Sequence, residues 1–353
     1  MSGGVDSSTT AWLLKEEGYE VIGATMCIGT TERTVGGPAR CCSLSDIEDA
    51  RRVALQIGIP FTVFHLREEF EKEIIDYFCE EYAKGRTPNP CIRCNEKVKF
   101  GSFLRKALEL ETDFIATGHY ARLDVEQGYY LLKRGVDRKK DQSYVLFSLT
   151  QDQLGHTLFP LGNLRKEEVR EKALQLGLLV HDKPESQEVC FIQDSSYHSF
   201  LSERLKKSFG PGPIVDQQGK VLGKHKGIPF YTIGQRRGLR LAKGKPLYVT
   251  RIDRERNTIV VGFEEEVYSD TFLVDSLNWT VPRERVSFHE IQVKIRYNHI
   301  GSEASISPRG DDELEVKFKF PQKAITPGQA AVFYDGETVM GGGWIKDIVR
   351  SAE

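Results

Sequence analysis

Near its start the chain carries a loop of glycine, aspartate and serine, residues 2–8 (SGGVDSS), directly before a helical stretch at residues 9–18. Two adjacent glycines let the backbone turn its N–H groups toward an anion, and the N-terminus of the helix adds partial positive charge. Serine and aspartate are also common helix caps, so a capped helix is the alternative interpretation. A Walker-type loop is excluded because no Gly-Lys-Ser/Thr ending is present. From the residues alone, a phosphate-binding loop and a capped helix both stay open.

The paired cysteines Cys91 and Cys94 form a second candidate site, within residues 87–95 (TPNPCIRCN). The two prolines predict an extended loop, and Asn95 is expected to cap a helix over residues 96–110. A thiol near a helix N-terminus has its thiolate favoured, which suits a nucleophile. A Cys-x-x-Cys pair in an unsecreted chain can also be a redox pair, half of a metal site or a coincidence.

The other cysteines bear on whether Cys91 and Cys94 belong to a metal site or to a disulfide framework. Cys41 and Cys42 are adjacent and lack the spacing of a second zinc-binding pair, which argues against a zinc ribbon. Cys190 lies among apolar residues, where a lone cysteine is more often a packing residue. The seven cysteines are an odd number in a chain without a secretory signal, so thiol chemistry or metal ligation is expected rather than a disulfide framework.

The loop at residues 2–8 resembles the pyrophosphatase loop of ATP-cleaving adenylating enzymes, and the whole chain resembles the tRNA-specific 2-thiouridylase family. The second resemblance extends from end to end. Its segments are residues 2–8, 41–43, 116–122, 140–144, 159–162, 186–190, 231–239, 294–297 and 324–336. Members of this family sulfurate the wobble uridine, position 34, of tRNAs for lysine, glutamate and glutamine, and the resemblance implies that function here.

The resemblance implies that ATP is cleaved between its α- and β-phosphates and that AMP is transferred to the uracil 2-oxygen. A magnesium ion (Mg2+) would offset the phosphate charge. A sulfur-carrier protein, or a persulfide donor derived from a cysteine desulfurase, would load Cys190 as a persulfide. Cys94 would then attack Cys190 and leave a disulfide between the two. The implied ATP-binding residues are Ser2, Gly3, Gly4, Val5, Asp6, Ser7, Met26 and Gly118.

The resemblance also implies contacts with tRNA. Asn89, Pro90 and Cys91 would line the target uridine, which must leave its stack for chemistry at the base. Independent support comes from residues 217–248, which hold eight Lys or Arg and no Asp or Glu, although a solvated surface is the alternative interpretation. The full set of implied tRNA-binding residues is Asn89, Pro90, Cys91, His119, Lys140, Asp141, Gln142, Arg296, Tyr297 and Gln329.

Cys91 departs from the best-known form of the family, which has an aspartate with an acid/base role at this position. A thiol is a poorer substitute for a carboxylate at neutral pH. Cys91 also completes a set of three thiols with Cys94 and Cys190, and three cysteines with an open fourth position would suit a [4Fe-4S] cluster that binds sulfide. The persulfide and the cluster require the same residues, so both routes stay open.

The elements that position these residues alternate between strand and helix up to about residue 200. Helices are predicted at residues 45–58 and 68–84, and strands at residues 20–26, 60–66 and 113–118. This alternation predicts an α/β domain with a doubly wound parallel sheet. Because the glycine loop has no strand before it, we expect the first strand of that sheet to be missing.

Beyond about residue 210 the helical period gives way to short alternating runs, such as residues 248–252 and 315–320, between Gly, Pro and Asp turns. The length of 353 residues is enough for three domains. The prediction is an ATP-binding domain over residues 1–203, a small β-rich tRNA-binding domain over 204–270 and a C-terminal β-barrel over 271–353.

Composition excludes several classes of protein. No run of about 18 apolar residues is present, so no transmembrane helix is expected, and the first residues lack a secretory signal. A cytoplasmic protein without a membrane partner is the expectation. Two other functions stay open. Another adenylating enzyme, such as an amide-forming synthetase, would share the loop but not need Cys94 or Cys190. A non-catalytic tRNA-binding or iron–sulfur carrier protein would bind tRNA without breaking down ATP.

Overall fold

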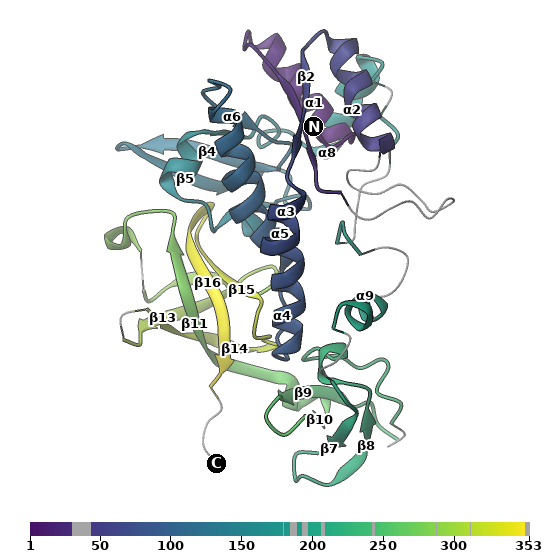
Figure 1. The fold of residues 1–353 in the computed structure, drawn as a ribbon. Helices are drawn as coiled ribbons and strands as arrows, with labels where there is room; N and C mark the ends of the chain where they lie inside the picture. The colour runs from purple at the N-terminus through teal and green to yellow at the C-terminus, as the bar shows by residue number, and fades with distance from the viewer. Residues whose placement is uncertain are drawn as a thin grey trace.

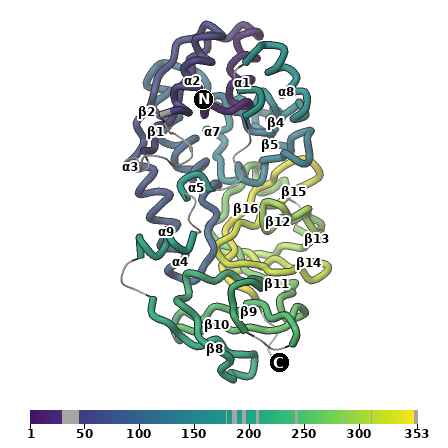
Figure 2. The backbone as a smooth tube through the Cα atoms, turned by 90° about the vertical axis from the view of Figure 1, so that its right-hand side faces the viewer, coloured from purple at the N-terminus to yellow at the C-terminus, as the bar shows by residue number. Residues whose placement is uncertain are grey.

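The computed structural model describes residues 1–29, 44–178, 180–183, 189–192, 197–205, 209–241, 244–286, 288–310 and 312–349. These residues form an N-terminal part of helices and short parallel strands, a small four-stranded sheet and a C-terminal barrel (Figure 1). In Figure 2 the barrel lies between the N-terminal part at the top and the small sheet at the bottom. The last part of the sequence therefore adjoins the first.

The N-terminal part contains two pairs of parallel strands. β1 (Gly23–Cys27) pairs with β2 (Phe61–His65), and β3 (Ile115–Ala116) pairs with β6 (Thr157–Leu158). The connection from β1 to β2 contains α2 (Leu44–Ile57), as expected because a parallel pair needs a crossover. This arrangement confirms the predicted α/β class.

Two long helical runs cross the middle of the molecule, and each contains a π-helical segment. The first run consists of α3 (Arg67–Phe70), η1 (Glu71–Asp76) and α4 (Tyr77–Ala83). The second consists of α5 (Pro90–Cys94), η2 (Asn95–Phe103) and α6 (Leu104–Leu108). The other described helices are α1 (Val5–Glu16), η3 (Ser143–Leu146), α7 (Gln151–Gly155), α8 (Lys166–Gln175), α9 (Tyr197–Arg204), η4 (Ile228–Phe230), η5 (Glu264–Val267) and η6 (Arg283–Arg285).

The small sheet has its strands in the order β8, β7, β10, β9. Its core contains Ile214, Val249, Ile259 and Val261, all fully buried. This confirms the predicted small β-rich fold between the N-terminal part and the barrel. The strands are β7 (Gly212–Val215), β8 (Val221–His225), β9 (Tyr248–Asp253) and β10 (Thr258–Gly262).

Six antiparallel strands close into the C-terminal barrel, in the order β11, β14, β13, β12, β15, β16 and back to β11. Along β14, Leu314, Val316 and Phe318 are buried and alternate with less buried residues, as a barrel wall requires. The strands are β11 (Tyr268–Trp279), β12 (Ile291–Lys294), β13 (Ser302–Pro308), β14 (Leu314–Lys323), β15 (Ala330–Asp335) and β16 (Thr338–Ile348). The predicted barrel is confirmed, whereas the predicted domain limits stay predictions.

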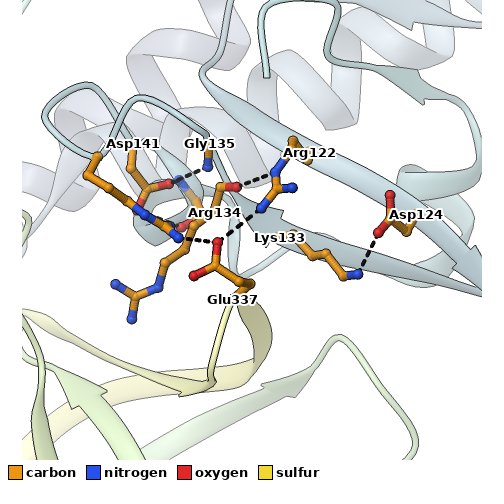
Figure 3. Close-up of polar contacts among 9 residues, drawn as sticks. Arg122, Asp124, Lys133, Arg134, Gly135, Asp141 and Glu337 are labelled. Atoms are coloured by element: carbon orange, nitrogen blue, oxygen red, sulfur yellow. Dashed lines mark hydrogen bonds and ion pairs between the residues drawn. The ribbon is translucent and has the colours of Figure 1, made fainter. Parts of the chain in front are cut away.

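A hairpin from the N-terminal part extends the barrel sheet, which the strand–helix pattern did not predict. It consists of β4 (Ala121–Glu126) and β5 (Tyr129–Arg134), and β5 pairs with β16 at Lys133 and Thr338. Arg122 reaches across this junction to Glu337 (3.0 Å) and also donates to the carbonyl of Arg134 (2.8 Å), as Figure 3 shows. The hairpin thus joins the barrel to the N-terminal part.

Candidate active site

The glycine loop leads directly into α1, which begins one residue after Gly4. Within the loop, Ser7 Oγ accepts a hydrogen bond from the backbone N–H of Ser2 (3.0 Å). The hydroxyls of Ser7 and Ser8 donate to the carbonyl of Gly4 at 3.2 and 2.9 Å. The serines therefore brace the loop from inside, and Gly4 at the cap position offers no capping side chain. This geometry favours a phosphate-binding loop over the capped-helix alternative.

Two glycines place the loop where a side chain would not fit. Gly3 has a φ of +69°, and a Cβ added to it would lie 2.6 Å from the carbonyl oxygen of Asp46 in α2. Gly118, just after β3, faces Asp6, and a Cβ there would lie 2.9 Å from the carbonyl carbon of Asp6. The loop is therefore packed between α2 and the end of β3. Of the implied ATP-binding residues, Gly118 lies against Asp6 and Ser7, while Gly3 packs against Asp46.

Gly118→Ala is expected to weaken ATP binding without unfolding the chain. The added methyl must push the Asp6 backbone away, which displaces the first turn of α1 and with it the phosphate loop. We expect the KM for ATP to rise by about tenfold, the equivalent of ~1.4 kcal/mol of strain. Gly210→Ala is the control, because Gly210, like Gly118, lies outside the positive-φ region and nothing lies within 4 Å of a Cβ there. An unchanged KM for Gly118→Ala would contradict this placement of the loop.

The carboxylate of Asp6 is held by two side chains distant in the sequence. Lys166 Nζ lies 2.6 and 2.8 Å from its two oxygens, and the hydroxyl of Tyr120 donates to Oδ1 at 2.8 Å. Lys166 is only 4% exposed and Tyr120 is buried. A buried ammonium needs a counter-charge, so Lys166 and Asp6 depend on each other. Sequence analysis missed Lys166 and did not assign Tyr120 a role in the loop.

The carboxylates near the loop form no ready-made metal site. Asp6 is engaged by Lys166, and Asp46 accepts from Lys183 Nζ at 2.8 Å. Across the described ranges, no three His, Cys, Asp or Glu side chains are grouped so that they could bind a metal ion. Magnesium in nucleotide sites is bound largely by phosphates and water, with only one or two carboxylates. Magnesium bound with the nucleotide would therefore be held mainly by phosphate oxygens and water, and its presence stays a prediction.

The helix that carries the paired cysteines is capped by Asn89. Its side-chain oxygen accepts from the N–H groups of Cys91 (3.1 Å) and Ile92 (3.3 Å), and Pro90 occupies the first helical position. The prediction that Asn95 caps the following helix is wrong. The helix runs through Asn95, which is 1% exposed and donates from Nδ2 to the carbonyl of Val145 (2.8 Å). The helix begins at Pro90, five residues before Asn95, because proline is favoured at the first helical position.

Cys94 and Cys190 both pack against one apolar cluster that also receives Met26 of β1. Cys91, by contrast, is exposed at the second residue of α5. The buried members of this cluster, which we call the aromatic cluster, are Ile28, Leu66, Phe70, Ile74, Ile75, Phe78, Cys79, Tyr82, Val98, Phe191 and Leu201. The structure therefore brings both predicted catalytic cysteines and one predicted nucleotide-binding residue to the same cluster.

Cys79 differs from these two cysteines. It is buried inside the aromatic cluster, and burial raises the pKa of its thiol to about 11. At neutral pH this thiol is protonated, so it is a packing residue and not a nucleophile.

An iron–sulfur cluster receives no support from the arrangement of the cysteines. A [4Fe-4S] cluster would need three thiolates gathered around one position. Among the residues with described positions, which include Cys91, Cys94 and Cys190, no such metal-binding group is found. The residues as placed do not fit the cluster, and no step of the reaction is derived through it.

Two of the implied tRNA-binding segments lie side by side. Tyr297 is exposed and its ring meets that of Tyr144 edge-on, with centroids 6.3 Å apart. Tyr144 follows Gln142 by two residues, so the segment at residues 140–142 adjoins Arg296 and Tyr297. Arg296 is exposed and donates from Nη1 to the carbonyl of Lys323 (2.9 Å).

Asp141 and Gln142 use their side chains to shape their own segment. Asp141 is buried and accepts from the N–H groups of Gly135 and Ser143, both at 3.1 Å, and Figure 3 shows the bond to Gly135. Gln142 accepts from the N–H of Tyr120 at 3.0 Å. The segment is thereby fixed beside Tyr120, and so beside the phosphate loop.

His119 is more enclosed than a surface contact would be. It is buried between Phe100 and Phe159, and Nδ1 lies 2.8 Å from Thr117 Oγ1. Burial, helped by the charge of Lys99, holds the pKa of His119 well below its usual value. His119 is therefore neutral at pH 7, and its contact with tRNA stays a prediction.

The basic segment at residues 217–248 presents its charges to solvent on the small sheet. The seven described Lys and Arg side chains in it are exposed, and none forms an ion pair within the part of the chain that the structure describes. We call these seven residues the basic surface: Lys220, Lys224, Lys226, Arg236, Arg237, Arg240 and Lys245. Unpaired exposed cations of this density favour a polyanionic partner over an ordinary solvated face.

Three family models match successive parts of the chain. A tRNA methyl transferase HUP domain matches residues 1–194, and a tRNA methyl transferase PRC-barrel domain matches residues 198–263. An aminomethyltransferase beta-barrel domain matches residues 269–345. The three matches follow the order of the three parts of the fold.

Relatives of full length carry one shared name, tRNA-specific 2-thiouridylase MnmA. The protein of Halothermothrix orenii is 52% identical over 349 residues, and that of Acetivibrio thermocellus is 52% identical over 350 residues. The protein of Clostridium acetobutylicum is 50% identical over 352 residues, and all three alignments cover 98% of both chains. The chain belongs to the tRNA-specific 2-thiouridylase family. The resemblance noted in the sequence is thereby confirmed.

For this member of the thiouridylase family, the structure leaves some predicted segments outside its described residues. Cys41, Cys42 and residues 184–188 are among them. The structure adds contacts that no local pattern signalled, above all Lys166, which lies 160 positions from Asp6 in the sequence. No helix in the described ranges combines the length and the apolar character needed to cross a membrane.

Proposed function

We propose that the chain is an ATP-dependent sulfurtransferase that converts the wobble uridine (position 34) of tRNAs for lysine, glutamate and glutamine to 2-thiouridine, in the cytoplasm. The observation that carries the proposal is the packing of Cys94 and Cys190 against one cluster with Met26. An adenylating enzyme without sulfur chemistry would need the phosphate loop but no such pair of thiols. Relatives named 2-thiouridylases support the choice.

The first step activates the base. The phosphate loop, from Ser2 to Ser7, binds ATP with its backbone N–H groups, and magnesium bound with the nucleotide supplies charge neutralisation. The uracil 2-oxygen attacks the α-phosphorus, the bond to the β-phosphate breaks, and pyrophosphate leaves. The 2-oxygen then departs as part of AMP, a far better leaving group than oxide.

The second step transfers sulfur. A carrier protein, or a persulfide from a cysteine desulfurase, first converts Cys190 to a persulfide. Its terminal sulfur attacks C2 of the uracil, and AMP leaves. The Cys94 thiolate attacks the Cys190 sulfur and breaks its bond to the transferred sulfur, so that 2-thiouridine and a Cys94–Cys190 disulfide result. A cellular dithiol reduces this disulfide before the next turnover.

The tRNA is bound by groups on all three parts of the molecule. Asn89, Pro90 and Cys91 line the flipped uridine, while residues 140–142, His119, Gln329 and the exposed pair Arg296 and Tyr297 contact the surrounding nucleotides. Tyr297 is 38% exposed, and an exposed aromatic ring can stack on a base. The basic surface extends this contact to the phosphates of the stem.

Removing charge from the basic surface is expected to lower the affinity for tRNA and also to make that affinity less dependent on salt. In the triple variant Arg236→Gln, Arg237→Gln and Arg240→Gln, the slope of log Kd against log salt should fall by about 2–3, near one unit per lost phosphate contact. Filter binding between 50 and 200 mM salt, about the range where such slopes are steep, measures it.

The matched control for this variant removes three exposed charges that are already paired with glutamates. These are Arg52→Gln, Lys319→Gln and Lys346→Gln. The control should leave the slope unchanged. Equal slopes for both triple variants would show that the basic surface is only a solvated face.

Pyrophosphate release tests the proposed function against its alternatives. Purified chain with ATP, magnesium, a sulfur donor and an unmodified wobble-uridine tRNA should release pyrophosphate over multiple turnovers, and omission of the tRNA should remove most of the signal. The Cys190→Ala variant should still adenylate the base and release about one equivalent per bound tRNA, since sulfur transfer follows activation. No pyrophosphate from the wild type would favour the non-catalytic tRNA-binding protein. Unimpaired multiple turnovers by Cys190→Ala would favour another adenylating enzyme.

A further inference from the structure

The segment before α5, the helix that carries Cys91 and Cys94, forms hydrogen bonds with both the barrel and the part that contains the small sheet. These bonds meet at one residue, Thr87. Its N–H donates to the carbonyl of Pro327 in the barrel (2.9 Å). Its hydroxyl donates to Thr232 Oγ1 in the part that contains the small sheet (3.2 Å). Gln329 Nε2 donates to the carbonyls of Thr87 (2.9 Å) and Pro88 (3.3 Å). The three parts of the molecule thus meet at Thr87.

The barrel loop that makes these contacts is fixed in place. The N–H of Gly328 donates to the carbonyl of Ile345 (2.9 Å), and the N–H of Ile345 donates back to the carbonyl of Gln329 (2.8 Å). Gly328 has a φ of +91°, and a Cβ on it would lie 3.0 Å from both N and O of Thr87. The loop therefore approaches Thr87 as closely as a glycine allows.

The sequence of residues 87–90 explains why a side-chain amide binds this segment. Pro88 and Pro90 have no N–H, so the segment offers mainly carbonyl oxygens to its surroundings. Gln329 supplies the donor that two successive carbonyls need. The prolines also restrict the backbone, so a shift at Thr87 is passed on to Asn89, the cap of the cysteine helix.

We propose that Gln329 is a positioning residue, which holds the segment before Cys91 and Cys94 in register with the tRNA-binding groups on the barrel. The inference rests on the proposed function and revises one part of it. The resemblance makes Gln329 a tRNA contact, whereas its amide N–H groups are taken by Thr87 and Pro88. Its primary task is then to set the position of the cysteine helix, and any contact of its oxygen with tRNA is secondary.

The test compares Gln329→Glu with wild type in the full chain. Glutamate has the same size, but its carboxylate cannot donate to the two carbonyls and places oxygen against oxygen. Gln322→Glu is the matched control, because Gln322 is a barrel glutamine that contacts His299 (3.1 Å) instead of Thr87. Thermal melting of each variant checks that the chain is folded, and Gln329→Met is the second variant if glutamate prevents folding.

Three readouts separate positioning from tRNA contact. Hydrogen exchange of the peptide over residues 84–95 should become about tenfold faster in Gln329→Glu, the factor that the loss of one net hydrogen bond carries. The single-turnover rate of thiolation should fall by about the same factor. The Kd for tRNA should stay within about twofold of wild type, since the amide N–H groups of Gln329 do not donate hydrogen bonds to RNA. Gln322→Glu should change none of the three.

The opposite pattern overturns the proposal. A weaker tRNA affinity with unchanged exchange at residues 84–95 would make Gln329 a tRNA contact alone, and unchanged exchange with an unchanged rate would give it neither role. The exchange measurement needs no ATP, tRNA or turnover. If the wild type made no 2-thiouridine, the proposed function would fail. Faster exchange in Gln329→Glu would even then support the role of Gln329 in holding the segment at Thr87.

Discussion

Lys166→Met is expected to remove ATP-dependent activity and to destabilise the N-terminal part. Methionine fills the same space but leaves the Asp6 carboxylate without the ammonium that lies 2.6 and 2.8 Å from its oxygens. Breaking such a pair costs about 3–5 kcal/mol, and we expect the lower end because the Asp6 side chain is 30% exposed. Pyrophosphate release should fall by about 100-fold or more, the rate equivalent of that loss. Urea unfolding and a pyrophosphate assay measure the two effects.

Two further variants show whether the pair itself is responsible. Lys172→Met makes the same substitution on the same helix, α8, away from Asp6, and should change neither quantity by much. The double variant Lys166→Met with Asp6→Asn removes both charges and should regain much of the stability, though not the activity. If the double variant were as unstable as the sum of the single ones, Lys166 would stabilise the fold by packing and not through Asp6.

Cys94→Ala and Cys190→Ala are expected to abolish sulfur transfer while leaving ATP binding intact. Each thiol makes or breaks a bond to the transferred sulfur in the proposed reaction, so its loss should lower the thiolation rate by about 10³-fold or more. Neither residue lies in the phosphate loop, and both are only half-buried beside the aromatic cluster. The single-turnover rate of 2-thiouridine formation and the Kd for ATP are the measured quantities.

Cys79→Ala is the matched control for the two catalytic variants. Its thiol is buried in the same aromatic cluster and protonated at neutral pH, so we expect lower stability and retained sulfur transfer. Cys91→Ala distinguishes the persulfide route from one that needs a third thiol. Measurable thiolation by this variant agrees with a persulfide on Cys190, whereas a loss as complete as that in Cys190→Ala, with an unchanged Kd for tRNA, would indicate a third thiol in the chemistry.

Motifs carried most of what the sequence could predict. The roles of the loop at residues 2–8 and of the two cysteine segments came from a family resemblance carried by motifs, and the α/β class and the small β modules followed from periodicity. The pairing of Asp6 with Lys166 was beyond such reasoning, because it depends on how α8 packs beside α1 and leaves no local pattern. The same holds for Gln329 and Thr87, which lie 242 positions apart.

Two errors of local structure have identifiable causes. Asn95 was expected as a cap because asparagine is a common cap before a helical pattern. Asn89 was the better candidate, since Pro90 directly after it is the preferred first residue of a helix. The hairpin of β4 and β5 was overlooked because its strands interrupt a strand–helix alternation. The sequence does contain a turn signal, Gly128. In the structure Gln127 and Gly128 both have positive φ, as a tight hairpin requires.

Formation of 2-thiouridine tests the central claim most directly. A wobble-uridine tRNA would be incubated anaerobically with ATP, magnesium, a cysteine desulfurase with cysteine, and the chain, and its nucleosides would be analysed by mass spectrometry. The account predicts 2-thiouridine with the wild type, none without ATP, and none with Cys190→Ala. Equal amounts from wild type and Cys190→Ala, or none from the wild type while a known thiouridylase succeeds in parallel, would contradict it.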